Sequence, residues 1–393
     1  MDELSQSMSK QYSVFDQESK NQFVADLFHI AKTKRQDNCW CGSNKRFIDC
    51  HAGRESERII SESQMRSEIS KIMDDPKFCC ATFDSNNCNG IIKGAHTIQR
   101  GRVLASMTND NHVGTFYRNR FGFDKIISIQ NGIKHQASIF YGFCDFHDVD
   151  LFKGFEVSEF TVTVENCWAS SYRAICHEYY QKSAAKDAVL WMKENLDKGR
   201  QLYEQLMIQE NLALLEIDIH KGFDDIHRIK IEFEKIRTHF QYKRFTSYVI
   251  QLDKPLDIAV CGTVAPFHDL LGKKIQNLGD PHKLFEHFFI STVTMSGNAA
   301  YVISYLDSHH IIIAYLKALF SRDYQFIIQW LTKSIFAHSE NTYFRLDWWT
   351  GIDKQRQQAI YDLAMVENYT QPFAYDDLVS GSTTGKIVSI TKI

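Results

Sequence analysis

Several features that mark common protein classes are missing from this 393-residue sequence. It contains only five prolines and no repeat, low-complexity tract or obvious flexible linker, so we expect domains that pack against one another. The first residues carry neither a basic stretch nor an apolar core, and no segment approaches the ~18 apolar residues of a membrane span. We therefore expect no secretory signal, no membrane as a partner, and a cytoplasmic location.

A large excess of charge of one sign is also missing, because the formal net charge is −3. The total hides a local bias, since residues 91–135 contain seven basic residues against two acidic ones, with four aromatic residues among them. Basic side chains interleaved with aromatic rings are typical of surfaces that bind phosphates and stack bases. The alternative is a solvated loop face with a few core aromatics, so nucleic acid is a candidate partner of the region 91–135.

Hydrophobic residues make up 44% of the sequence and aromatic residues 13%, enough for more than one core. Helical spacing of apolar residues dominates several stretches, above all 164–239, whereas alternating and continuous apolar runs between 245 and 306 indicate strands of an antiparallel sheet. The fold class predicted is α+β with several domains. We expect them at 1–54 (helix and zinc module), 55–156 (linker helix and second Cys/His module), 157–244 (helical scaffold) and 245–393 (α+β domain).

Cysteine carries most of the functional information. Ten cysteines in a chain without a secretory signal indicate metal ligands or free buried thiols rather than disulfides. In the segment CWCGSNKRFIDCH, two cysteines are one residue apart and a Cys-His pair closes the loop. Four soft ligands that leave no position for water are typical of a structural zinc site. We therefore predict Zn²⁺ bound by Cys39, Cys41, Cys50 and His51.

The same segment resembles the SEC-C motif, a small zinc-binding segment found at the C-terminus of the translocation ATPase SecA and in many bacterial proteins. The resemblance covers residues 39–51 and includes C-x-C-G-S, the basic pair Lys45 and Arg46, and the final Cys-His. Asn44 stands where the motif usually has glycine, and asparagine tolerates a left-handed backbone. The resemblance implies a docking module rather than a catalyst. No GxxxxGK[ST] phosphate loop is present, which excludes the ATPase activity of SecA.

A second group of cysteines and histidines begins at residue 79. The segment FCCATFDSNNCNGIIKGAHTIQRG supplies a Cys-Cys pair, a third cysteine and a histidine, and YGFCDFHDVDLF supplies a Cys-x-x-His-Asp turn. Two such turns, separated by a basic and β-rich stretch, can close around a second Zn²⁺. The alternative is that these cysteines are buried apolar thiols. Either member of the pair, Cys79 or Cys80, is available as a ligand, and the set we predict is Cys80, Cys88, Cys144 and His147.

The order of elements over residues 79–156 resembles an HNH nuclease or, more broadly, a treble-clef ββα-metal module. The resemblance implies that His96 is the general base that activates water for attack on a phosphodiester, and that His147 or Asp148 holds a divalent ion such as Mg²⁺ or Mn²⁺. Ala95 stands where the family has a carboxylate or histidine, and a long insertion separates the two halves. A purely structural zinc fold without activity is the alternative.

These observations lead to two hypotheses about function. The first is a bacterial nucleic-acid-associated protein with two zinc modules, for which the HNH resemblance implies metal-dependent nuclease activity in a defence or toxin role. The second is a non-enzymatic, zinc-stabilised adaptor that docks on a protein or ribosomal partner through its SEC-C segment. The N-terminal zinc site is closed in both, so catalysis would have to come from His96, His147 and Asp148.

Overall fold

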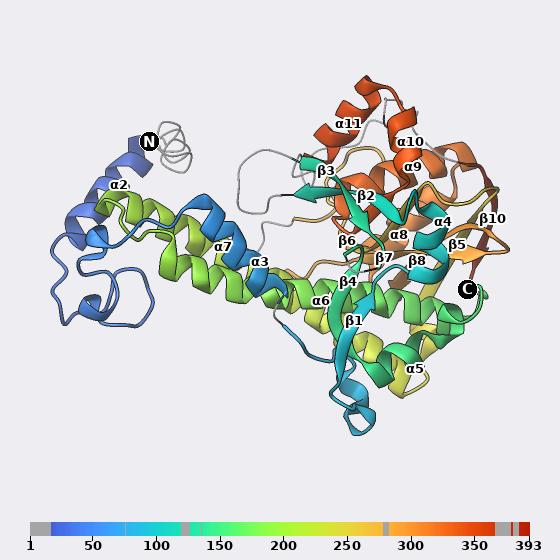
Figure 1. The fold of residues 1–393 in the computed structure, drawn as a ribbon, viewed down its shortest axis with the longest axis horizontal. Coiled ribbons are helices and arrows are strands. Elements are labelled where there is room, and N and C mark those ends of the chain that lie inside the picture. The colour runs from blue at the N-terminus through green and yellow to red at the C-terminus, as the bar shows by residue number, and fades with distance from the viewer. Residues whose placement is uncertain are drawn as a thin grey trace. The chain divides into compact units, whose positions relative to one another are not determined.

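The chain divides into two compact units, and each combines stretches that are far apart in the sequence (Figure 1). The small unit is Met1–Asp75 with Lys182–Gly222, and the large unit is Pro76–Gln181 with Phe223–Ile393. The mixed helix and strand content expected from the sequence is confirmed, whereas the four consecutive domains remain a prediction. The computed structural model describes residues 17–74, 76–118, 126–134, 136–277, 283–365, 379 and 385–393.

The small unit is helical. Two long helices, α6 and α7, contribute residues to both units and are joined by a short turn within the small one. The helix α3 begins at Glu62, because Ser61 and Gln64 form a capping box in front of it. The Gln64 N–H donates to Ser61 Oγ at 3.3 Å, and the Ser61 N–H donates to Gln64 Oε1 at 3.2 Å. The elements are α2 (Gln17–Ile30), η1 (Phe47–Asp49), η2 (Arg54–Ser56), α3 (Glu62–Asp74) and parts of α6 (Val164–Asn195) and α7 (Leu202–Thr238).

The large unit is built on an antiparallel sheet with the strand order β10-β5-β8-β7-β6-β9-β2-β3. The antiparallel sheet predicted between residues 245 and 306 is its centre. Besides its parts of α6 and α7, the unit contains η3 (Thr82–Asn87), β1 (Ile92–His96), η4 (Arg100–Leu104), α4 (Ala105–Met107), β2 (His112–Arg118), β3 (Ile126–Gly132), β4 (Ile139–Cys144), α5 (Asp145–Glu156), η5 (Tyr242–Arg244), β5 (Phe245–Leu252), β6 (Ile258–Val264), β7 (Phe288–Met295), β8 (Asn298–Leu306), α8 (His310–Phe320), α9 (Tyr324–His338), β9 (Thr342–Phe344), α10 (Leu346–Gly351), α11 (Lys354–Met365) and β10 (Ile387–Lys392).

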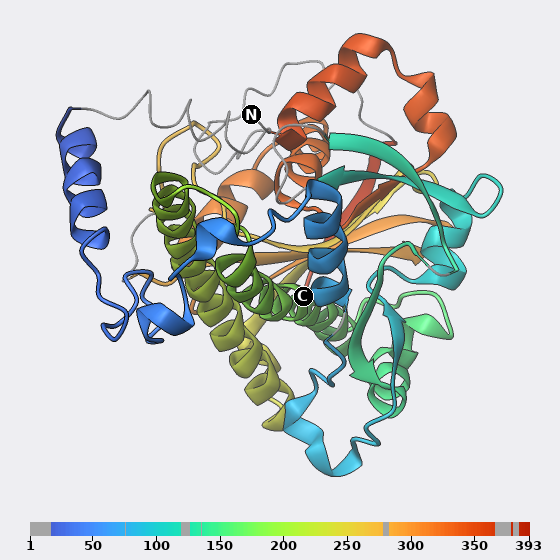
Figure 2. The same ribbon diagram turned by 60° about the vertical axis from the view of Figure 1, so that its left-hand side comes forward.

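Helices cover both faces of this sheet (Figure 2). Side chains of consecutive strand residues point to opposite faces, and buried residues divide accordingly. One face packs against α6 and α7, through Val249, Phe289, Val302, Trp168 and Phe233. The other packs against α8 and α9, through Ile250, Ile290, Ile303, Ile312 and Leu331. Burial on both faces explains why these strands read as continuous apolar runs in the sequence.

A separate ββα unit precedes the long helices. The strand β1 pairs antiparallel with β4, with Ile92 opposite Cys144 and His96 opposite Ile139, and α5 follows β4 directly. The long insertion between β1 and β4 contains β2 and β3, and β2 pairs with β9 of the large sheet. The insertion therefore extends that sheet rather than forming a loose loop. Along the described ranges, no helix combines the length and apolar character needed to cross a bilayer.

Candidate metal centres

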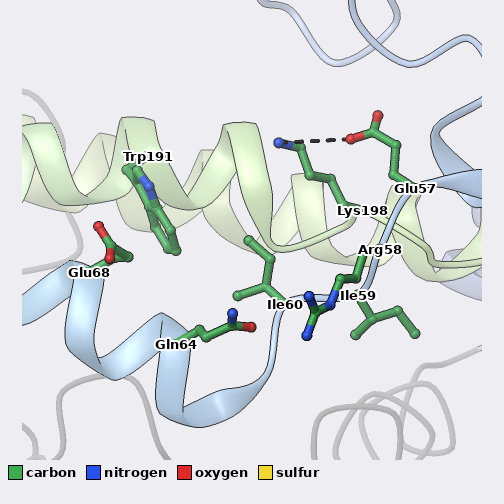
Figure 3. A pocket seen from close by; sticks show the side chains of 8 residues that line it. All are labelled: Glu57, Arg58, Ile59, Ile60, Gln64, Glu68, Trp191 and Lys198. Atoms are coloured by element: carbon green, nitrogen blue, oxygen red, sulfur yellow. Dashed lines mark ion pairs between the residues drawn. The ribbon is translucent and has the colours of Figure 1, made fainter.

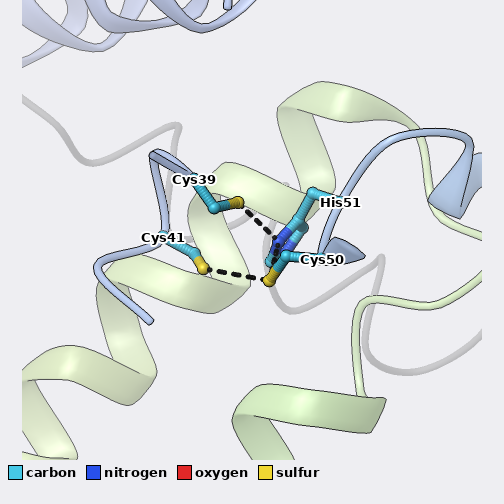
Figure 4. Close-up of side chains that lie close together, drawn as sticks. All are labelled: Cys39, Cys41, Cys50 and His51. Carbon is cyan, nitrogen blue, oxygen red and sulfur yellow. Dashed lines mark hydrogen bonds between the residues drawn. The ribbon is translucent and has the colours of Figure 1, made fainter. Parts of the chain in front are cut away.

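Four ligand atoms converge in the small unit, in the loop that follows α2 (Figure 4). The sulfurs of Cys39, Cys41 and Cys50 and a ring nitrogen of His51 all lie within 4.8 Å of one another. Cys50 Sγ is 3.6 Å from Cys41 Sγ and 3.1 Å from His51 Nδ1, and Cys39 Sγ is 3.2 Å from that nitrogen. In a tetrahedral site with Zn–S bonds of about 2.3 Å, sulfur atoms lie about 3.8 Å apart. The predicted ligand set is therefore compatible with Zn²⁺.

Backbone turns bring these ligands together. The Cys39 N–H donates to the Lys45 carbonyl at 2.8 Å, which closes the first turn. Within that turn Gly42 and Asn44 have φ values of +75° and +58°, the left-handed region that glycine and asparagine tolerate best. Asparagine thus serves where the SEC-C motif usually has glycine. The 3₁₀ turn η1 then returns the chain so that the final Cys-His pair faces the first two cysteines.

Hydrogen bonds within this cluster shift the pKa values of its members. A hydrogen bond with Cys39 lowers the pKa of the Cys41 thiol to about 2, and that same hydrogen bond together with burial raises the pKa of Cys39. Burial opposes the charged form of His51, but hydrogen bonds with Asp197 and Cys41 outweigh it and raise its pKa to about 9. A divalent cation bound between the three sulfurs would favour the thiolate form that coordinates it.

A second group of four ligands lies in the large unit. The ligand atoms of Cys79, Cys88, Cys144 and His147 all lie within 4.8 Å of one another. His147 Nδ1 is 3.1 Å from Cys144 Sγ and 3.3 Å from Cys79 Sγ. The composition is again three cysteines and one histidine, which suits a closed tetrahedral zinc site.

The choice of Cys80 as a ligand of this site has to be corrected to Cys79. Cys80 is fully buried, and its sulfur lies 3.8 Å from the carbonyl oxygen of Cys176 on α6. Its N–H donates to the Gly142 carbonyl on β4 at 2.8 Å, whereas the sulfur of the adjacent Cys79 lies 3.3 Å from His147 Nδ1. Cys79 therefore faces the cluster while Cys80 faces the core.

The start of α5 positions the last two ligands. Cys144 ends β4 and is the N-cap of α5, where its sulfur accepts from the His147 N–H at 3.5 Å. Burial disfavours the Cys144 thiolate, but the backbone N–H groups of His147 and Asn89 more than offset this effect and lower its pKa to about 7. Burial raises the pKa of Cys79 to about 12. The thiolate preference at a helix N-terminus is the usual effect of unpaired N–H groups there.

The three predicted catalytic residues do not gather at one point. His147 belongs to the second cluster, where its ring nitrogen would bind zinc rather than a catalytic ion. His96 ends β1, its Nε2 donates to the Ile133 carbonyl at 3.1 Å, and burial lowers its pKa. Asp148 lies in the first turn of α5, where burial raises its pKa and its buried Oδ1 has no hydrogen-bond partner.

His96 and Asp148 nevertheless share charged neighbours. Both experience the charges of Arg173 and Glu156, which form an ion pair at 2.6 Å, and the Arg173 guanidinium lies 3.8 Å from the centre of the Phe152 ring. Beyond the two Cys₃His clusters, the described residues contain no other group of three potential ligands within the same separation.

The basic region 91–135 is only partly described. Lys93 forms an ion pair with Asp145 at 2.7 Å, and Arg102 donates to the Val157 carbonyl at 2.9 Å, whereas Arg100 is exposed. Arg120 and Lys125 lie outside the described residues. A nucleic-acid surface here remains a prediction.

Each cluster has an aspartate that the sequence did not reveal. His51 Nε2 lies 2.8 Å from Asp197 Oδ2, and His147 Nε2 lies 3.3 Å from Asp84 Oδ2. Asp84 lies between the ligands Cys79 and Cys88 in the sequence, so its place in the chain could have suggested that it lies near the cluster. Asp197 lies 146 residues from His51, and nothing in the sequence connects the two.

The small unit also contains a pocket of about 370 Å³ (Figure 3). Ile59, Ile60 and Trp191 form its apolar part, and Ile59 is 45% exposed. Charged side chains surround them, including Lys198, which lies 3.8 Å from Glu57. The remaining lining residues are Arg58, Gln64 and Glu68.

The chain matches no protein family, no curated protein and no solved structure in comparisons with each.

Proposed function

We propose that this protein is a zinc-stabilised nucleic-acid-binding protein whose ββα unit carries the binding site. The observation that supports the proposal best is the order of its parts. Two cysteines precede β1, β1 pairs with β4, and the other two ligands are the N-cap and a first-turn residue of α5. This is the order of a treble-clef module, and the HNH nucleases it resembles carry their base near the end of the first strand. His96 has that position.

The state of His96 suits a general base. Burial lowers its pKa, so the ring is neutral near pH 7. Its Nε2 proton is directed to the Ile133 carbonyl, which leaves the lone pair on Nδ1. In phosphodiester hydrolysis Nδ1 would take the proton of the attacking water as the new P–O bond forms and the P–O bond to the leaving sugar oxygen breaks. Among the charged side chains that act on His96 is the carboxylate of Glu156.

A divalent ion would need ligands from the substrate. Mg²⁺ is usually held by one or two carboxylates together with phosphate oxygens and water. This is consistent with the lack of a third preformed ligand group among the described residues. The two Cys₃His clusters are closed, so the zinc they bind would be structural.

A cleavage assay tests this function. Purified protein is incubated with plasmid DNA, single-stranded DNA and RNA, with Mg²⁺ or Mn²⁺, and we expect cleavage of at least one of them. His96→Ala should lower cleavage by 10²-fold or more, the typical contribution of a general base, while zinc content stays the same. His112→Ala is the matched control, because His112 is an exposed histidine on β2. Absence of both binding and cleavage for every substrate would overturn the proposal.

The second candidate function is an adaptor. It is favoured by the pocket around Trp191, which lies in the same unit as the closed SEC-C-like cluster. An adaptor requires no chemistry, so wild type and His96→Ala would both be inactive under every metal condition. Cleavage, together with measured binding to the same DNA and RNA substrates, therefore separates the two functions.

A further inference from the structure

Asp197 lies in the turn between α6 and α7 and is fully buried. Its two carboxylate oxygens accept three hydrogen bonds: from Arg54 Nε at 2.7 Å, His51 Nε2 at 2.8 Å and Gln209 Nε2 at 2.8 Å. A buried carboxylate is costly unless it is paired and fully hydrogen-bonded, and this one is. One of its three donors is the imidazole whose other nitrogen faces the three sulfurs. Asp197 thus lies directly behind a metal ligand.

Arg54 joins the same loop to the end of α6. Its guanidinium donates to the Cys50 carbonyl at 3.0 Å and to the carbonyls of Lys193 and Glu194. The last carbonyls of a helix lack partners within the helix, and a cation near them is favourable. The Arg54 side chain therefore connects the ligand loop, Asp197 and the end of α6.

The turn itself approaches the loop closely. The Gly199 N–H donates to the Arg54 carbonyl at 2.9 Å, and Gly199 has a φ of +71°. A Cβ at this position would lie 2.6 Å from the Glu57 carbonyl oxygen. Both the left-handed φ and the lack of space for a Cβ require glycine at this position. The turn and the loop are thus held together by backbone as well as side-chain contacts.

We propose that Asp197 is an outer-sphere positioning residue for Zn²⁺ at the cluster of Cys39, Cys41, Cys50 and His51, and that zinc binding and ordering of the α6–α7 turn are one event. A carboxylate on Nε2 fixes the tautomer that presents the Nδ1 lone pair to the metal. In return, a metal-bound His51 is oriented toward Asp197. The inference rests on zinc binding by this cluster and is independent of nucleic-acid binding.

Asp197→Asn in the full-length protein tests the proposal. Asparagine has nearly the same shape as aspartate but replaces one acceptor oxygen with an NH₂ group. This NH₂ group would face a donor of Arg54, His51 or Gln209 and could not accept its hydrogen bond. We expect a 10- to 100-fold lower zinc affinity in competition with a chromophoric chelator, the usual effect of losing such a partner. Glu194→Gln is the matched control, because it keeps the Glu194 backbone carbonyl and changes only a side chain in an exposed ion pair with Lys45, so zinc affinity should stay unchanged.

Hydrogen exchange read by mass spectrometry supplies a second measurement, which assigns the effect to this cluster. Zn²⁺ added to the metal-free protein should protect residues 193–209 as well as 39–54, and Gly199→Ala should reduce protection of both. If Zn²⁺ protects only 39–54 and Asp197→Asn binds it as tightly as wild type, the inference is wrong while the zinc site stands. If Zn²⁺ protects neither segment in wild type, the zinc site is wrong and the inference fails with it.

Discussion

At the scale of single residues, the two clusters share an arrangement that reaches beyond the four ligands. In both, histidine turns Nδ1 toward the sulfurs and Nε2 toward an aspartate, Asp197 in one and Asp84 in the other. The aspartate of the first cluster is fully buried and the side chain of the second is 29% exposed, at distances of 2.8 Å and 3.3 Å respectively. Because a shorter and more deeply buried hydrogen bond holds the imidazole more firmly, the first site should depend more on its aspartate.

Substitution of the adjacent cysteines tests the ligand set of the second cluster. Cys79→Ser removes a ligand, so we expect zinc content to fall from two equivalents per chain to one. Cys80→Ser should retain both, because Cys80 lies in the core and a serine hydroxyl there can donate to the Cys176 carbonyl. Elemental analysis of both variants beside wild type gives the answer. The opposite pattern, with zinc lost only from Cys80→Ser, would restore Cys80 as the ligand.

At the scale of elements, the parts that could be predicted are those whose signal is local. All four ligands of the first cluster lie within residues 39–51, and the left-handed conformation at Asn44 follows from its side chain. The strands of residues 245–306 were predictable from their apolar runs. Cys79 could not be chosen over Cys80, because two adjacent cysteines are equivalent in the sequence and differ only in the direction that their side chains face. That direction is set by pairing with Gly142, more than sixty residues later.

The insertion between β1 and β4 shows a second limit. Its strands β2 and β3 fall inside the expected domain 55–156, yet β2 pairs with β9 in the expected domain 245–393. Similarly, residues 182–222 belong to a continuous helical pattern, but they form one unit with residues 1–75. Sequence periodicity reports which face of an element is buried and contains no information about which distant element covers it.

The contact between β2 and β9 gives a prediction at this scale. A Cβ on Gly114 would lie 2.2 Å from the Phe344 ring, which is enclosed by Phe116 and Trp349 at centroid distances of 5.0 and 5.1 Å. The ring has no room to move away, so Gly114→Ala should lower the free energy of unfolding by about 1–3 kcal/mol, the usual cost of overpacking. Chemical denaturation measures the effect.

Gly101→Ala is the control for that experiment. Gly101 lies in η4, nearby in the sequence, and a Cβ there would meet nothing within 4 Å. We expect it to change stability by less than about 0.5 kcal/mol. Equal effects of the two substitutions would show that the β2–β9 contact is not as tight as the structure indicates.

At the scale of the whole molecule, each unit contains one complete cluster. The ligands and the aspartate of the first cluster all belong to the small unit, and those of the second all belong to the large unit. The large unit also has an extensive core on both faces of its sheet, whereas the small unit has few buried apolar residues among those described. A small module with little core depends on its metal for folding more than a large one does.

Loss of one zinc at a time should therefore have unequal consequences. Cys50→Ser is expected to increase hydrogen exchange in residues 39–74 and 182–222 and to leave the sheet strands protected, because among the described residues the core of the sheet includes none from the small unit. Cys144→Ser should expose the ββα unit around residues 79–156 while the same sheet strands remain protected. Each variant should retain one zinc by elemental analysis. Increased exchange throughout the chain in Cys50→Ser would contradict this division, since it would mean that the large unit cannot hold its fold without the first cluster.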